Sequence, residues 1–174
     1  MTMQYLLAGF GGQGVLFAGK FLANKGLLEE KQVSWMPSYG PEMRGGTANC
    51  SVIISDELIG SPIVSTPDVL AALNQPSLNK FEKAVKKGGT IFVDSSLVNR
   101  KVERDDVTVV YIPAARLASD NEVPDLANMI LLGKLLSDAD EGLIKEILLQ
   151  SVSSNRQDMI DANLKAFLIG KNYK

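Results

Sequence analysis

Two stretches rich in glycine carry the residues that could bind an anion. The first begins at Gly9, and its turn consists of Gly11, Gly12, Gln13 and Gly14 at the predicted start of a helix. Backbone amides at a helix start attract phosphate and carboxylate groups, so this turn could contact an anion that is held mainly by a neighbouring chain. Equally, the glycines could do no more than let the chain turn sharply.

The second stretch, residues 38–46, is predicted to be a rigid polar loop that contacts a substrate or a neighbouring subunit. Its Gly40-Pro41 pair is a turn signal, because proline fixes its own backbone angle and keeps the preceding residue out of the helical region. Arg44, followed by two glycines, could bind a carboxylate or phosphate through two hydrogen bonds, or could pair with Glu42 or Asp56 to brace the loop. A purely structural connection is the alternative. The candidate residues are Ser38, Tyr39, Gly40, Pro41, Glu42, Met43, Arg44, Gly45 and Gly46.

The spacing of Gly9, Gly11 and Gly14 also matches the first half of a dinucleotide-binding fingerprint. The second half is missing, because an acidic residue should end the second strand and hold the ribose, whereas Met36-Pro37-Ser38 stands there. A free-standing dinucleotide-binding oxidoreductase that uses the Gly9–Gly14 turn is therefore the alternative function and not the main prediction.

The sequence offers little catalytic chemistry of its own. It contains no histidine, which removes the commonest general base and the triads that depend on it. Cys50 is the single cysteine, it lies on the apolar face of a predicted strand, and an iron–sulfur cluster needs about four thiolates. Asp94, at the end of a predicted strand, is more simply a cap than a catalytic group. We predict no catalytic residue and no metal site in this chain.

Composition bounds the class of protein. The 174 residues suit one domain, residues 1–174, and 45% hydrophobic residues are typical of a globular protein. A formal net charge of −2 gives no electrostatic basis for binding nucleic acid. The first residues lack a cationic start, and glycines interrupt every apolar run, so we expect no signal peptide and no membrane span. The expected location is the cytoplasm.

Strands and helices alternate along the chain, which predicts an α/β fold of three layers, α/β/α, with a Rossmann-like start. Strand 47–55 is predicted to turn back as a hairpin at residues 56–60, so the mostly parallel sheet is mixed. Three helices are predicted after residue 124. The predicted strands are residues 4–8, 33–36, 47–55, 69–73, 90–93 and 107–112. Because ligands bind beyond the carboxyl ends of parallel strands, we expect residues 9–14, 38–46, 74–77 and 94–96 to meet at one rim of the sheet.

The two glycine-rich stretches, at this distance from one another, resemble the gamma subunit of the 2-oxoacid:ferredoxin oxidoreductases, the pyruvate/ketoisovalerate oxidoreductase catalytic-domain family. The resemblance continues through Ser61-Pro62, Leu73-Asn74-Gln75-Pro76-Ser77 and Asp94-Ser95-Ser96, and it thins after that point. It implies a subunit that is inactive alone. It also implies a reaction in which a 2-oxoacid is oxidatively decarboxylated to acyl-CoA and CO₂ while ferredoxin is reduced. The form of the loop favours 2-oxoglutarate or a branched-chain substrate.

The same resemblance implies how the cofactors and partners are divided. Thiamine diphosphate, Mg²⁺ and iron–sulfur clusters would be held by alpha, beta and delta-type partner subunits, with ferredoxin as electron acceptor and coenzyme A as co-substrate. In agreement, this sequence lacks the Gly-Asp-Gly segment expected of a thiamine diphosphate site. The isolated chain could form a homodimer. A third interpretation is an architectural assembly module that does not touch the active centre.

Overall fold

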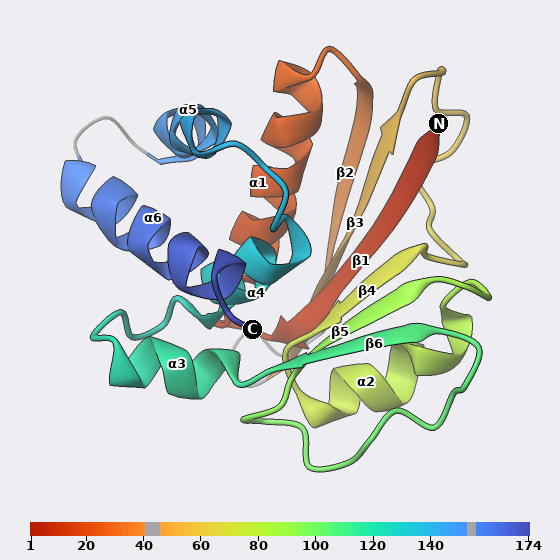
Figure 1. The fold of residues 1–174 in the computed structure, drawn as a ribbon. Helices are drawn as coiled ribbons and strands as arrows, with labels where there is room; N and C mark the ends of the chain where they lie inside the picture. The colour runs from red at the N-terminus through yellow and green to blue at the C-terminus, as the bar shows by residue number, and fades with distance from the viewer. Residues whose placement is uncertain (41–45, 153–155) are drawn as a thin grey trace.

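The computed structural model describes residues 1–40, 46–152 and 156–174. Its strands form one six-stranded sheet in the order β2-β3-β1-β4-β5-β6 (Figure 1). They are β1 (Thr2–Phe10), β2 (Gln32–Tyr39), β3 (Thr47–Ser55), β4 (Val69–Ala72), β5 (Thr90–Asp94) and β6 (Thr108–Ile112). Strand β3 is antiparallel to both of its neighbours, and the other pairs are parallel. Every strand except β3 therefore runs in one direction, which confirms the predicted mostly parallel, mixed sheet.

Helices cover both faces of the sheet. They are α1 (Val15–Leu28), α2 (Gln75–Phe81), α3 (Ala114–Asp120), α4 (Ala127–Leu135), α5 (Glu141–Ser151) and α6 (Gln157–Lys171), with a short 3-10 turn at Glu82–Ala84. Helix α2 lies on one face of the sheet, and α1, α4, α5 and α6 lie on the other (Figure 1). This arrangement confirms the predicted three layers. The sequence prediction missed α3, so four helices, not three, follow the last strand in the described part of the chain.

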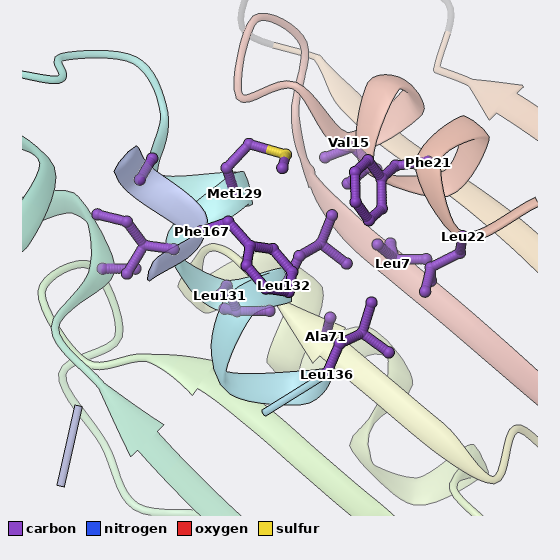
Figure 2. Close-up of a cluster of buried hydrophobic side chains, with 14 of the residues drawn as sticks. Leu7, Val15, Phe21, Leu22, Ala71, Met129, Leu131, Leu132, Leu136 and Phe167 are labelled. Atoms are coloured by element: carbon purple, nitrogen blue, oxygen red, sulfur yellow. The ribbon is translucent and has the colours of Figure 1, made fainter. Parts of the chain in front are cut away.

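The main hydrophobic core lies between the sheet and the larger helical layer. Phe21 of α1 and Phe167 of α6 face one another there, with their ring centroids 6.1 Å apart (Figure 2). Leu7 of β1 and Met129 of α4 extend the same cluster. A second, smaller core lies under α2 and contains Leu6, Leu70, Leu78, Ile91 and Val93. Because β1 supplies Leu7 to one core and Leu6 to the other, its alternating side chains join the two layers.

Helix α1 approaches the sheet closely because glycine replaces larger residues on its inner face. A Cβ atom at Gly19 would lie 2.2 Å from the sulfur of Cys50, and one at Gly26 would lie 2.7 Å from Val33. Helices α4 and α6 cross in the same way, since a Cβ at Gly133 would lie 1.9 Å from the carbonyl oxygen of Phe167. These contacts hold α1 against the sheet and α6 against α4.

Two details of the predicted topology were wrong. Strand β2 does not end near residue 36 but continues to Tyr39, so Ser38 and Tyr39 belong to a strand and not to a loop. Pro37 is tolerated because β2 lies at the edge of the sheet, where a missing N–H removes no bond to a further strand. The hairpin predicted after β3 does not form. Strand β3 is paired along its length with β1 on one side and β2 on the other, which leaves no edge for a returning strand.

Candidate functional site

The rim formed by the carboxyl ends of the parallel strands brings together the predicted site segments. Ala8 of β1 is in register with Ala72 of β4, and Ala72 with Val93 of β5, so the segments after these strands start side by side. On the other side, Gly9 is paired with Ala48, which in turn is paired with Tyr39 of β2. The end of β2 therefore lies at the same rim, two strands from β1.

The side chain of Gln13 fastens the glycine turn to the neighbouring segment. Its Oε1 accepts hydrogen bonds from the amide of Phe10 at 2.6 Å and from Nδ2 of Asn74 at 3.1 Å. Its Nε2 donates to the carbonyl of Leu73 at 3.2 Å. The backbone amide of Gln13 donates to the carbonyl of Phe10 at 3.2 Å and closes the turn. Gln13 was predicted as an anion contact, and in this structure its hydrogen-bonding groups hold the turn in shape.

The two glycine-rich stretches touch one another directly. The amide of Gly11 donates to the carbonyl of Gly46 at 2.9 Å, and the amide of Gly40 donates to the carbonyl of Thr47 at 2.8 Å. Tyr39 is 64% exposed beside them, and Ser38 is exposed as well. The remaining predicted loop residues, Pro41, Glu42, Met43, Arg44 and Gly45, lie outside the described residues.

Gly12 and Gly14 adopt backbone angles that side chains rarely allow, with φ of 92° and 70°. The carbonyl of Gly14 accepts a hydrogen bond from the amide of Ala18 and another, at 3.0 Å, from Nδ2 of Asn128. A Cβ at Gly14 would lie 2.3 Å from that nitrogen, so the absence of a side chain makes the contact possible. Sequence analysis assigned no site role to Asn128, because a contact between residues so far apart in the chain leaves no local pattern.

A cleft of about 300 Å³ lies beside the glycine turn. One wall is formed by Gly12 and Gln13, and the others by Leu97, by one side of α3 and by the segment that leads from α3 to the start of α4. That loop contains Asp125, whose φ of 64° is unusual for a residue with a side chain. Most of the lining residues are small or apolar, and none of the described ones carries a positive charge.

Asp94 has the structural role that the sequence indicated. Its carboxylate accepts hydrogen bonds from the amides of Ser96 and Ala115, both at 3.0 Å, and so fastens the end of β5 to the start of α3. Burial raises the pKa of this carboxyl group, while these hydrogen bonds oppose the shift. Both oxygens of Asp94 are therefore engaged in holding two segments of the chain together.

Comparison with known proteins decides the family. Residues 4–173 match the family described as pyruvate ferredoxin/flavodoxin oxidoreductase. The chain belongs to this family. It is 39% identical to the ketoisovalerate oxidoreductase subunit VorA of Methanothermobacter marburgensis, over 96% of this chain but only 35% of that relative. It is 37% identical to the 2-oxoglutarate synthase subunit KorC of Methanocaldococcus jannaschii, over 98% of this chain and 92% of that relative.

Solved structures have the same fold as this member of the pyruvate ferredoxin/flavodoxin oxidoreductase family. The gamma subunit of a keto/oxoacid ferredoxin oxidoreductase from Geobacter sulfurreducens is 29% identical, with a TM-score of 0.81 over 97% of this chain and 96% of that one. The 2-oxoglutarate:ferredoxin oxidoreductase from Magnetococcus marinus, at 23% identity, shares the fold with a TM-score of 0.86 over 99% of this chain and 32% of that one. The alternative of a free-standing dinucleotide-binding oxidoreductase is not supported by these matches.

The cysteine of this family member is not suited to holding a cluster. Cys50 is fully buried between β3 and α1, and burial raises the pKa of its thiol to about 12. A neutral thiol in a closed core is neither a nucleophile nor a ready metal ligand. Within residues 1–40, 46–152 and 156–174, no group of three or more histidine, cysteine, aspartate or glutamate side chains is placed to hold a metal ion. None of the described helices is long and apolar enough to span a membrane.

Proposed function

We propose that this chain is the gamma-type subunit of a cytoplasmic 2-oxoacid:ferredoxin oxidoreductase. The complex would oxidatively decarboxylate a 2-oxoacid, 2-oxoglutarate or a branched-chain one, to acyl-CoA and CO₂ while reducing ferredoxin. The observation that carries this proposal is the family match over residues 4–173. The relative named as a 2-oxoglutarate synthase subunit adds support, because the likeness extends over 92% of its length.

The second part of the proposal is that the chemistry belongs to other subunits. Thiamine diphosphate, Mg²⁺ and the iron–sulfur clusters would be bound by alpha, beta and delta-type companions. For the clusters this is supported by the cysteine content, because Cys50 is the single cysteine of this sequence and is buried, whereas a cluster needs about four thiolates. Support also comes from the relative in Methanocaldococcus jannaschii, which is itself named as one subunit of a 2-oxoglutarate synthase.

The third part concerns the rim. We propose that the turn Gly11–Gly14 and the loop 38–46 face the companion subunits and complete the path by which the 2-oxoacid or coenzyme A reaches the active centre. The hydrogen bond between Gly11 and Gly46 supports this, because it makes the two segments one surface. Exposed Phe10, Tyr39 and Leu97 give the same rim apolar side chains of the kind that protein interfaces bury. We expect an anionic group to approach the amides of Gly12 and Gly14, which lie at the start of α1.

The experiment is reconstitution with the companion subunits, followed by 2-oxoacid-dependent and coenzyme A-dependent reduction of ferredoxin. Tyr39→Ala should weaken assembly, and Arg44→Ala should lower turnover or raise the KM for coenzyme A or the 2-oxoacid. Leu149→Ala is the control, because Leu149 is exposed on α5, away from the rim. If both rim variants assemble and turn over as the unmodified complex does, the rim has no part in the mechanism. If the chain is isolated from its own cells without thiamine-dependent companions, or acts on a 2-oxoacid alone, the subunit assignment is wrong.

A further inference from the structure

Strand β2 forms an open edge of the sheet, because its one neighbour among the described strands is β3 (Figure 1). The amide of Gly40 donates to the carbonyl of Thr47, and this pair continues the register of β2 with β3 by one residue. Hydrogen-bonded and non-hydrogen-bonded pairs alternate in an antiparallel ladder, so the even-numbered residues of β2 bond to β3. The odd-numbered residues direct their backbone groups away from the sheet, and these are Val33, Trp35, Pro37 and Tyr39.

This edge has little of the protection that edge strands usually carry. Natural edge strands are commonly short, bulged or charged, which keeps other strands from pairing with them. Strand β2 is eight residues long, it pairs with β3 in an unbroken register, and its sequence QVSWMPSY contains no charged residue. Pro37 protects its own end of the strand, because it has no N–H to donate towards a further strand. The part of β2 before Pro37 is therefore open to a partner strand.

Pro37 also restricts the register in which a partner strand can pair. An antiparallel pair of two β2 strands with its two-fold axis at Ser34 keeps the proline outside the ladder. Val33 of each copy is then opposite Trp35 of the other, and every outward N–H and C=O group of these residues is used. The next position sets Pro37 opposite Lys31, whose amide already donates to a carbonyl of its own chain at 2.9 Å. The ladder therefore ends there without leaving a donor unpaired.

We propose that this chain forms a homodimer in which β2 pairs with β2 of a second copy about a two-fold axis at Ser34. On the face of the sheet that α1 covers, Trp35 of one copy would lie opposite Val33 of the other, and aromatic and β-branched side chains pair well across strands. Val33 lies against Gly26 near the end of α1, and the next residue, Leu27, is 59% exposed. Trp35, which is 41% exposed in the single chain, would be buried against these side chains. On the opposite face the two Ser34 hydroxyls would meet.

This dimer leaves the rim free in both copies. Two antiparallel β2 strands direct their carboxyl ends in opposite directions, so the two rims lie at opposite ends of the interface. Tyr39, which is 64% exposed at the rim, follows Pro37 and lies outside the ladder. The dimer therefore does not depend on the proposed function, and each copy keeps its rim open to companion subunits.

The first test uses Trp35, which is the single tryptophan of the chain and so reports on this contact by its fluorescence. In a dilution series of the full chain from about 100 µM to about 1 µM, sedimentation velocity should show a dimer dissociating to a monomer. The emission of Trp35 should shift to longer wavelength over the same range, because the indole becomes more exposed to water. A chain that is monomeric throughout overturns the proposal and leaves the open edge to a companion subunit. A dimer whose dissociation does not change the emission of Trp35 overturns it as well.

A charge exchange at Ser34 tests the register. Ser34→Lys and Ser34→Glu each place two like charges opposite one another at the axis, and each should weaken dimerisation roughly tenfold or more at low salt. An equimolar mixture of the two variants should associate again, because opposite charges then meet. Ser38→Lys is the matched control, because Ser38 is exposed on the same face of β2 but lies beyond Pro37 and outside the ladder.

The mixture separates a lost contact from a lost fold, because an unfolded variant would not regain a partner. The proposal is overturned if folded Ser34→Lys dimerises as Ser38→Lys does, or if the mixture of folded variants associates no better than either variant alone. Circular dichroism establishes that each variant is folded. The dilution series needs no variant, so it decides the matter even if a charge at Ser34 prevents folding.

Discussion

Replacing Gln13 with methionine should destabilise the protein strongly, although the two side chains are similar in size. The substitution removes the acceptor for Phe10 and Asn74 and the donor for Leu73. Asn74 and Leu73 are buried, so each is left with an unsatisfied polar group, at about 1–3 kcal/mol apiece. The amide of Phe10 is nearer to water and adds about 1 kcal/mol. The expected loss in the free energy of unfolding is therefore about 3–7 kcal/mol.

A second consequence of Gln13→Met arises through Asn74. The Oδ1 of Asn74 accepts the amide of Ser77 at 2.9 Å and so caps α2, while its Nδ2 is held by Gln13. Losing the second contact loosens the cap, which is itself worth about 1 kcal/mol. The start of α2 should therefore lose hydrogen-exchange protection together with the glycine turn, although the two are separated by some sixty residues of sequence.

The measurement is urea unfolding of the isolated chain, with amide hydrogen exchange to locate the effect. Gln75→Met is the matched control, because the two hydrogen bonds of its side chain, to Asn79 and from Asn99, are exposed to solvent. The control should lose no more than about 1 kcal/mol. If Gln13→Met lowers the free energy of unfolding no more than this control does, Gln13 does not hold the glycine turn to the neighbouring segment.

Two further predictions test the packing and the electrostatics. Gly133→Ala should destabilise the protein by about 3 kcal/mol or more, because the new Cβ would meet backbone atoms of Phe167 where α4 and α6 cross. Gly60→Ala is the control, because a Cβ at Gly60 would have no atom within 4 Å, and it should change thermal unfolding little. A smaller or equal loss at Gly133 would contradict the close crossing. The hydrogen bond from Lys31 lowers the pKa of the Asp56 carboxyl to about 2, so the pair stabilises the fold above the ordinary aspartate pKa and loses that effect as the pH falls towards 2. The difference in unfolding midpoint between the unmodified chain and Asp56→Asn should accordingly shrink as the pH falls from about 4 to about 2. It should also shrink in high salt. A difference that stays constant would show that the pair of Lys31 and Asp56 does not stabilise the fold.

A strand is predicted well from the sequence where apolar and polar residues alternate within it. The alternation of Ala48, Cys50, Val52 and Ile54 placed strand 47–55 with the bounds that the structure has. Pro37 was misleading, because a proline ends a central strand but is harmless at the unpaired side of an edge strand. Whether a strand is central or at the edge depends on the strand order of the sheet. That order is set by which strands pair, and the sequence of a single strand does not contain this information.

Elements held by distant contacts were harder to predict. Helix α3 is seven residues long and has no side-chain cap of its own. Its start is instead held by Asp94, whose carboxylate accepts the amide of Ala115 from the neighbouring strand end. Asn128 was missed as a site residue for the same reason, since its partner Gly14 is 114 residues away. In both cases the residue type was visible in the sequence, but the contact that gives it a role is tertiary.

The position of β3 explains why a dinucleotide-like start does not make a dinucleotide site. In a Rossmann fold the second strand lies beside the first, and an acid at its end reaches the ribose of a nucleotide bound at the glycine turn. Here β3 lies between β1 and β2, so the end of β2 is two strand spacings from the glycine turn, about 10 Å and not about 5 Å. An acid at position 38 or 39 would therefore be out of place for a ribose. The same insertion places Gly46, the residue directly before β3, against Gly11. The rim therefore gains a second segment where a Rossmann fold has its ribose contact.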